Sequence, residues 1–150
     1  MDVVTMLSLL ISLGAFYYTY KSYKHNEKNN QKEQAKKISA HMTSIDNVKI
    51  ENNSDAPIFD VFIVICSNKQ DISNFNVWRP SPIYIDLLPP GSIEKKVKTA
   101  GHGCGGEKPS ANILFTDSNG LKWCRNNKGN ISEANDYKDK LKKIKIFPPY

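Results

Sequence analysis

The stretch FTDSNGLKWCRNNKGNI (115–131) carries the clearest signal for the fold. Its DSNG segment (117–120) is typical of a type I turn followed by a left-handed glycine, which is the loop of a three-residue hairpin with a bulge. Counting outward from this loop places Trp123 opposite Phe115 on one face of the hairpin. A second turn, NKG (127–129), ends the strand. The stretch therefore predicts an antiparallel hairpin whose two aromatic side chains meet in the core.

Short apolar or alternating runs separated by turn residues occupy most of the chain after Lys37. The run IFDVFIVIC (58–66) is nearly continuous and β-branched, as in a strand that is buried on both faces. The segment PPGS (89–92) suits a type II turn, with Pro90 second and Gly91 third. Strands are expected at 38–43, 47–52, 58–66, 83–88, 93–99, 111–116 and 121–126. About seven such strands predict an all-β, immunoglobulin-like antiparallel β-sandwich.

The amino terminus is expected to be a single transmembrane helix. Val3–Tyr20 contains eighteen residues without a charge, and a helix of about this length crosses the hydrocarbon core of a bilayer. Aromatic and basic side chains that follow such a run are typical of the membrane interface. The predicted interface residues are Tyr17, Tyr18, Tyr20, Lys21, Tyr23, Lys24 and Lys28. Since the lysines follow the run, they predict a carboxy-terminal domain in the cytoplasm, tethered to the inner membrane.

Two other interpretations of the apolar run stay open. Small residues at Ser12, Gly14 and Ala15 are compatible with a cleavable signal peptide, but such a peptide has a positive charge before the run, and here only Asp2 precedes it. A buried core helix is usually formed by a shorter apolar run than this one. The membrane anchor agrees best with the length of the run.

The size and charge of the chain suggest one domain with appendages. The 150 residues carry a net charge of +6. Residues 21–37 hold six Lys and two Glu, and residues 121–150 hold eight basic and three acidic residues, so the excess lies at the two ends. The expected organisation is an anchor (1–23), a basic polar stalk that is helical in part (24–37), a sandwich (38–131) and a basic tail (132–150). The stalk is either a solvated helix or a surface for anionic lipid.

Three segments resemble those of a set of small uncharacterised bacterial proteins: NNSDAPIFDV (52–61), LLPPGS (87–92) and the hairpin stretch 115–131. These proteins have an amino-terminal membrane helix, a short basic stalk and one all-β domain. The resemblance covers most of the chain and implies this fold and topology, but it brings no established activity. The loop GHGCGGEKPS (101–110) departs from the compact connection that the set usually has.

Candidate residues for chemistry are few. His102 and Cys104 share a glycine-rich loop and could join Cys124 at a metal or form a thiol–imidazole pair, but a plain glycine-rich surface loop is the favoured interpretation. The chain has no CxxC, HExxH, P-loop or dinucleotide-binding motif. Its odd count of three cysteines fits a reducing compartment, although one disulfide plus a free thiol stays open. We expect no cofactor and no enzymatic activity.

The expected partners are membrane lipid and an unknown protein, and no nucleic acid. Trp78 and Arg79 lie in WRPSP (78–82), which is either an exposed loop for a partner or a cover for the end of the sandwich. The basic candidates for partner binding are Lys140, Lys142, Lys143 and Lys145. The sequence favours a non-enzymatic, membrane-tethered binding or scaffolding module. The alternatives are a small membrane protein of the defence or superinfection-exclusion type and a thiol- or metal-dependent enzyme that uses GHGCGG.

Overall fold

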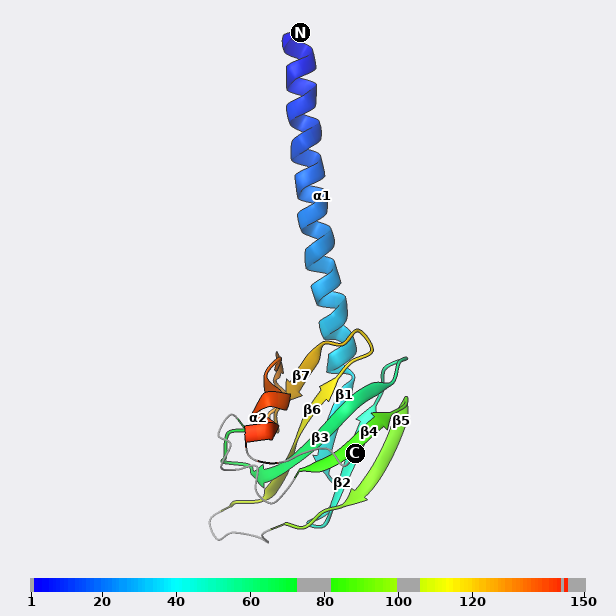
Figure 1. The fold of residues 1–150 in the computed structure, drawn as a ribbon, viewed down its shortest axis with the longest axis vertical. Helices are drawn as coiled ribbons and strands as arrows, with labels where there is room; N and C mark the ends of the chain where they lie inside the picture. The colour runs from blue at the N-terminus through cyan, green and yellow to red at the C-terminus, as the bar shows by residue number, and fades with distance from the viewer. Residues whose placement is uncertain (1, 73–81, 100–105, 144, 146–150) are drawn as a thin grey trace. The chain divides into compact units, whose positions relative to one another are not determined.

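The computed structural model describes the chain except for residues 1, 73–81, 100–105, 144 and 146–150 (Figure 1). Contacts within the chain divide it into two compact units, Met1–Gln34 and Ala35–Tyr150. The first unit consists of helix α1 (Val3–Lys36) up to Gln34, and the second contains all the strands. Ala35 is fully buried in the core of the second unit, so that unit begins three residues before Ile38.

Helix α1 is continuous over 34 residues, so the expected stalk is helical along most of its length. It is the one helix among the described residues that is long and apolar enough to cross a membrane, with a mean hydropathy of 1.5 over its most apolar window. None of that window is buried within the protein. The hydroxyl groups of Ser8, Ser12 and Thr19 each donate a hydrogen bond to a carbonyl one turn earlier, at 2.8–2.9 Å.

The second unit is an antiparallel β-sandwich. One sheet has the order β1 (Ile38–Met42), β2 (Asn47–Asn52), β5 (Gly91–Lys96). The other has the order β4 (Ile83–Leu88), β3 (Ile58–Ser67), β6 (Pro109–Thr116), β7 (Lys122–Arg125), β8 (Ile131–Glu133). All neighbouring strands pair antiparallel. Side chains from both sheets, including Ile50 of β2 and Ile63 of β3, form the core.

The strand pattern differs from the expected one in two respects, the number of strands and the bounds of β5 (Gly91–Lys96), which was expected at 93–99. The described residues hold eight strands instead of about seven, because β8 follows the second turn and is too short to show a sequence period. The PPGS segment does not join two paired strands: it carries the chain from β4 in one sheet to β5 in the other. Gly91 is already the first residue of β5, opposite Asn52, with a φ of 127° that glycine adopts readily.

The β6–β7 hairpin has the expected register. Phe115 pairs with Trp123, and both side chains are buried in the core. The buried Asp117 carboxylate holds the turn, since one oxygen accepts the backbone N–H groups of Asn119 and Leu121, both at 2.9 Å. Its other oxygen accepts the indole N–H of Trp123 at 2.8 Å. Gly120 has a φ of 81°, as the predicted turn requires.

A short helix covers the outer face of the five-stranded sheet. Helix α2 (Tyr137–Lys143) buries Tyr137 and Leu141 against Phe62, Val64 and Leu114. The rings of Phe62 and Tyr137 meet nearly edge to face, with centroids 5.9 Å apart. Residues 132–150, expected to be a basic tail, therefore include part of β8 and a helix that packs on the sandwich. The isolated pair of apolar residues, four positions apart among lysines, gave too weak a pattern to predict this.

The hairpin core yields a test of stability. Trp123→Ala should lower the free energy of unfolding by about 3–5 kcal/mol, because it empties a buried aromatic site. Trp123→Phe keeps most of the volume and loses the N–H donor to Asp117, so it should cost about 1–3 kcal/mol. Urea unfolding of a fragment that contains all of Ala35–Tyr150 measures both values. Equal stability of the parent and the Ala variant would contradict the hairpin core.

Candidate functional site

The expected membrane-interface residues lie on α1. Tyr17, Tyr18, Tyr20 and Tyr23 are all exposed, and the ammonium group of Lys24 lies 5.2 Å from the ring centroid of Tyr20. Lys21 is exposed on the same helix. The side chain of Lys28 lies outside the described part of the structure. No described fold partner covers these rings, which is the arrangement that an interfacial aromatic belt needs.

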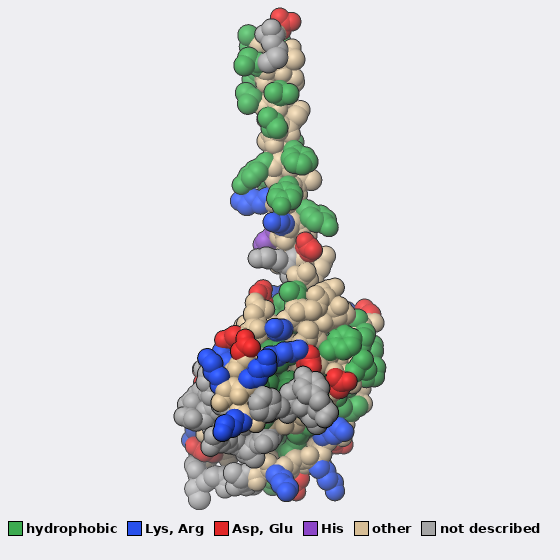
Figure 2. Space-filling model, in the orientation of Figure 1, with side chains coloured by type: hydrophobic (Ala, Val, Ile, Leu, Met, Phe, Trp, Pro, Cys, Tyr) green, Lys and Arg blue, Asp and Glu red, His purple; other side chains and the backbone are tan. Residues whose placement is uncertain are grey.

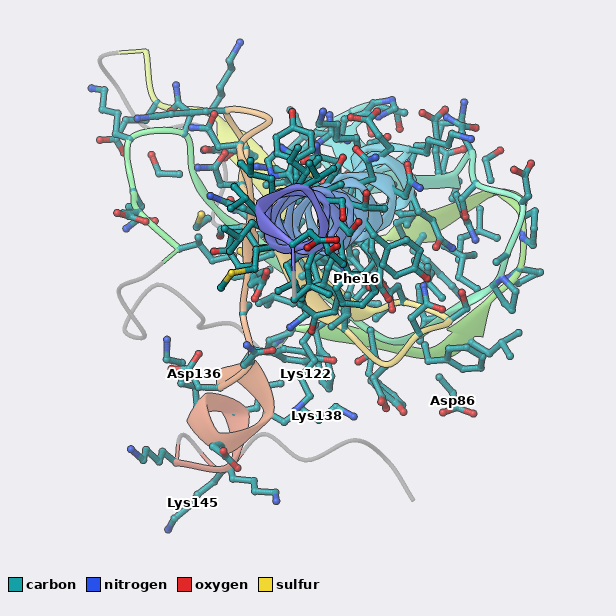
Figure 3. The ribbon with its side chains drawn as sticks, turned by 90° about the horizontal axis from the view of Figure 1, so that it is seen from above. Phe16, Asp86, Lys122, Asp136, Lys138 and Lys145 are labelled. Atoms are coloured by element: carbon teal, nitrogen blue, oxygen red, sulfur yellow. The ribbon has the colours of Figure 1, made fainter. Side chains whose placement is uncertain are left out.

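The other candidate residues are only partly placed. Trp78, Arg79, His102 and Cys104 lie outside the described residues. Lys140 forms an ion pair with Asp136 at 2.8 Å, one helical turn away. Lys142, Lys143 and Lys145 are exposed. The structure therefore brings the basic candidates together on and just after α2, and Figure 3 draws Lys145 on the side of α2 that faces away from Asp86.

Strand β3 contains a residue with an unusual backbone conformation near α2. The register of β3 against β6 shifts by one residue between Phe59 and Phe62, which is a β-bulge. Asp60 lies in this bulge with a φ of 48°, in the left-handed region that only glycine adopts freely. Such a conformation costs about 1–3 kcal/mol and persists only where the surroundings fix it.

Four side chains surround the bulge. The Tyr137 hydroxyl donates to the backbone carbonyl of Asp60 at 3.1 Å and lies 2.9 Å from the Thr116 hydroxyl. Lys138 of α2 forms a short ion pair with the Asp60 carboxylate. The Tyr84 hydroxyl lies 3.2 Å from the same carboxylate and 3.0 Å from that of Asp86. Burial is the largest cause of the raised pKa of both Tyr84 and Tyr137. Both phenols therefore stay protonated and can donate a hydrogen bond.

A cavity of about 240 Å³ lies beside β7, β8 and α2. Its polar or charged lining includes Asp71, Asn126, Asn130, Ser132, Glu133, Asp136 and Lys140. The apolar part includes Ile72, Leu114 and Ala134, and the Cys124 thiol also faces the cavity. Carboxylates outnumber the single lysine among these residues, so the cavity suits small polar or cationic groups better than anions.

The two described cysteines are poor nucleophiles. Burial raises the pKa of Cys124 to about 11, because the charged thiolate loses its hydration. Burial also raises the pKa of Cys66, whose sulfur accepts a hydrogen bond from the Asn112 amide at 3.1 Å. Both thiols are free. Within the described ranges no three His, Cys, Asp or Glu side chains gather where they could hold a metal ion.

Comparisons with protein-family models and with curated proteins find no match to this chain. A functional interpretation therefore depends on the geometry of α1, the sandwich and α2.

The sequence pattern gave Lys140, Lys142, Lys143 and Lys145 as candidates but did not indicate the β-bulge beside α2. Nothing in the run IFDVFIVIC (58–66) marks where the bulge falls. Tyr137 and Leu141 lie four positions apart and so on one helical face, which is a weak sign of a helix that packs on the sandwich. The bulge and the helix are coupled only in space, since 77 positions separate Asp60 from Tyr137.

The raised pKa of Cys124 predicts slow alkylation. Because only the thiolate reacts, a shift from 9.0 to about 11 should slow the reaction of the folded protein about 100-fold at pH 7–8. The rate should rise about tenfold per pH unit until the pH nears 11. Iodoacetamide kinetics in a variant that carries Cys66→Ala and Cys104→Ala measure this, with the urea-unfolded chain as the control. Rapid labelling of the folded chain at pH 7 would contradict a buried thiol.

The bulge predicts an ordered pair of effects at Asp60. Asp60→Asn keeps a residue that tolerates the left-handed region and loses only a half-exposed ion pair, so it should cost less than about 1 kcal/mol. Asp60→Val also forces a β-branched side chain into that region, so it should cost about 1–3 kcal/mol more. Thermal unfolding of both variants distinguishes these costs. If the Val variant is as stable as the Asn variant, Asp60 is not strained.

Proposed function

We propose that this protein is a non-enzymatic binding or scaffolding module, tethered by α1 at the cytoplasmic face of a bacterial inner membrane. The observation that carries the proposal is the unburied apolar part of α1, which is joined to a separately folded β-sandwich. Exposed side chains from Val3 to Leu13 would be costly in water, at roughly 25 cal/mol for each Å² of apolar surface. A bilayer removes that cost.

The polar residues of the apolar segment are compatible with hydrocarbon. A hydroxyl group without a partner is expensive in a bilayer, but the hydroxyls of Ser8, Ser12 and Thr19 have carbonyl acceptors within their own helix. The exposed tyrosines at the end of the segment would lie among lipid head groups, with Lys21 and Lys24 just beyond them. The lysines on this side support a location of the sandwich in the cytoplasm.

The sandwich supports a binding role better than a chemical one. Its described thiols are held protonated by burial, and its buried carboxylate, Asp117, is engaged by three N–H donors of the hairpin. Charged side chains of both signs lie on its surface, including on and around α2, where Figure 2 shows Lys and Arg beside Asp and Glu. We infer an immunoglobulin-like domain that presents its surface to another protein. Such domains commonly bind through edges, faces and loops.

Paired cysteine probes test the anchor and its orientation. Cys66 and Cys124 are shielded, so they report poorly on topology, and each probe belongs in a variant with all three native cysteines replaced by alanine. The two probes are Lys128→Cys and Asp2→Cys. Lys128 lies on an exposed turn of the sandwich, and Asp2 directly precedes the first residue of α1. In intact spheroplasts a membrane-impermeant maleimide should label Asp2→Cys and spare Lys128→Cys until lysis.

The reverse labelling pattern would contradict the orientation. Labelling of both probes before lysis would contradict the anchor, and carbonate extraction of the membrane fraction gives an independent check. An integral chain stays with the bilayer at alkaline pH, whereas a peripheral chain is released.

A further inference from the structure

Strand β4 forms one edge of the five-stranded sheet. It pairs with β3 on one side, and no other described strand pairs with it on the outer side. Its sequence, IYIDLL, contains no Lys, Arg or Pro, and its only charged side chain is Asp86. An edge of this kind presents a row of backbone N–H and C=O groups that can accept another strand.

The other three edges of the sandwich carry the devices that discourage pairing. Strand β5 carries Glu94, Lys95 and Lys96. Strand β8 is only three residues long. At the start of β1 the Arg125 guanidinium donates to the carbonyl of Ile38 at 2.6 Å. Charged residues, short length and covered carbonyls all discourage pairing at sheet edges, so β4 is the exception among the described edge strands.

Exposed apolar side chains continue the β4 edge. Leu87 is 48% exposed and lies directly opposite Phe59 of β3, which is 36% exposed. In Figure 2 hydrophobic side chains gather on the side of the domain where Figure 1 draws the ends of β4 and β5. A strand-addition site combines an unpaired backbone edge with side-chain contacts beside it, and the β4 edge offers both.

We propose that the β4 edge pairs with β4 of a second copy of this chain, so that two five-stranded sheets join across a twofold axis. An isologous interface of this kind needs a surface that is complementary to itself. Two antiparallel registers of IYIDLL each give five residue pairs, one with Ile85 and one with Asp86 on the axis. The Asp86 register opposes two carboxylates, which is destabilising, so Ile85 lies on the axis.

The residue pairs on either side of Ile85 in this register are also compatible. Tyr84 lies opposite Asp86 of the second copy, so each Asp86 carboxylate faces a neutral phenol instead of another charge. Ile83 lies opposite Leu87 of the second copy, which covers the most exposed apolar residue of the strand. Each of the five paired positions, Ile83 to Leu87, thus meets a chemically suitable one, as a twofold contact requires.

Membrane tethering favours this occupant, and in this respect the inference depends on the proposed function. Two chains anchored in one bilayer are confined to a thin layer, which raises their effective concentration well above that of free domains. An edge contact that is weak in solution can therefore be populated at the membrane. A short strand interface with few charges suits this regime.

The test measures self-association of the full chain in liposomes, by energy transfer between labels attached at the amino terminus. The parent chain should be dimeric. Leu87→Lys should reduce association at least tenfold, because it places a charge where Ile83 of the other copy would pack. Ile45→Lys is the matched control, since Ile45 is 41% exposed but lies in the loop between β1 and β2. This control should associate like the parent.

A parent chain that is monomeric overturns the proposal, as does a dimer that Leu87→Lys leaves unchanged, because α1 or another surface would then make the contact. Membrane fractionation of the same samples reports separately on the anchor, so a monomeric but membrane-bound chain contradicts the edge pairing alone. The register has its own readout. In a variant without native cysteines, Ile85→Cys should form a disulfide-linked dimer upon mild oxidation, whereas Lys95→Cys on the β5 edge should not.

Discussion

The buried carboxylate of Asp117 is the interaction on which the sandwich most depends. It accepts two backbone N–H groups of its own turn and the indole N–H of Trp123, so one side chain fixes both the turn and the strand that follows it. With the register fixed, Phe115 and Trp123 both point into the core between the sheets. A slip of one residue would turn every side chain of β7 to the opposite face.

The same register determines the outer face of the sheet. Leu114 and Cys124 pair across the hairpin on the face opposite to the aromatic pair. Leu114 then joins Phe62 and Val64 to form the surface against which Tyr137 and Leu141 of α2 pack. Helix α2 is too short to be stable alone, so this packing explains why a basic segment is helical at all. At the bulge, the Asp60 carbonyl accepts a hydrogen bond from Tyr137, and the Asp60 carboxylate forms an ion pair with Lys138.

The two units use apolar residues in opposite ways. The sandwich buries its apolar side chains between two sheets and under α2, and among its described residues the large ones that stay exposed are Ile45, Phe59 and Leu87. Helix α1 leaves its apolar side chains exposed along its first twenty residues. This contrast supports a bilayer as the solvent of α1 and water as the solvent of the sandwich. Phe59 and Leu87 are therefore candidates for contact with another molecule, because most described apolar side chains of the sandwich are covered.

The sequence by itself determined the features that depend on local patterns. The uncharged run from Val3 to Tyr20 indicated a helix long enough to cross a membrane, and the turn at 117–120 fixed the pairing of Phe115 with Trp123, because a hairpin register follows from its loop. Most strand positions followed from the alternation of apolar residues and from turn residues between the strands.

Only the tertiary structure decided which strands share a sheet, since hydrogen bonds between distant strands leave no local mark. It separated β4 from β5, although only two prolines lie between them. It also placed the bulge at Asp60, bound Arg125 to the Ile38 carbonyl of β1 and folded 137–143 onto the sheet, and among the described strands it left the outer side of β4 unpaired. These features arise from contacts between residues tens of positions apart, whose energies depend on packing that no short segment of the sequence contains.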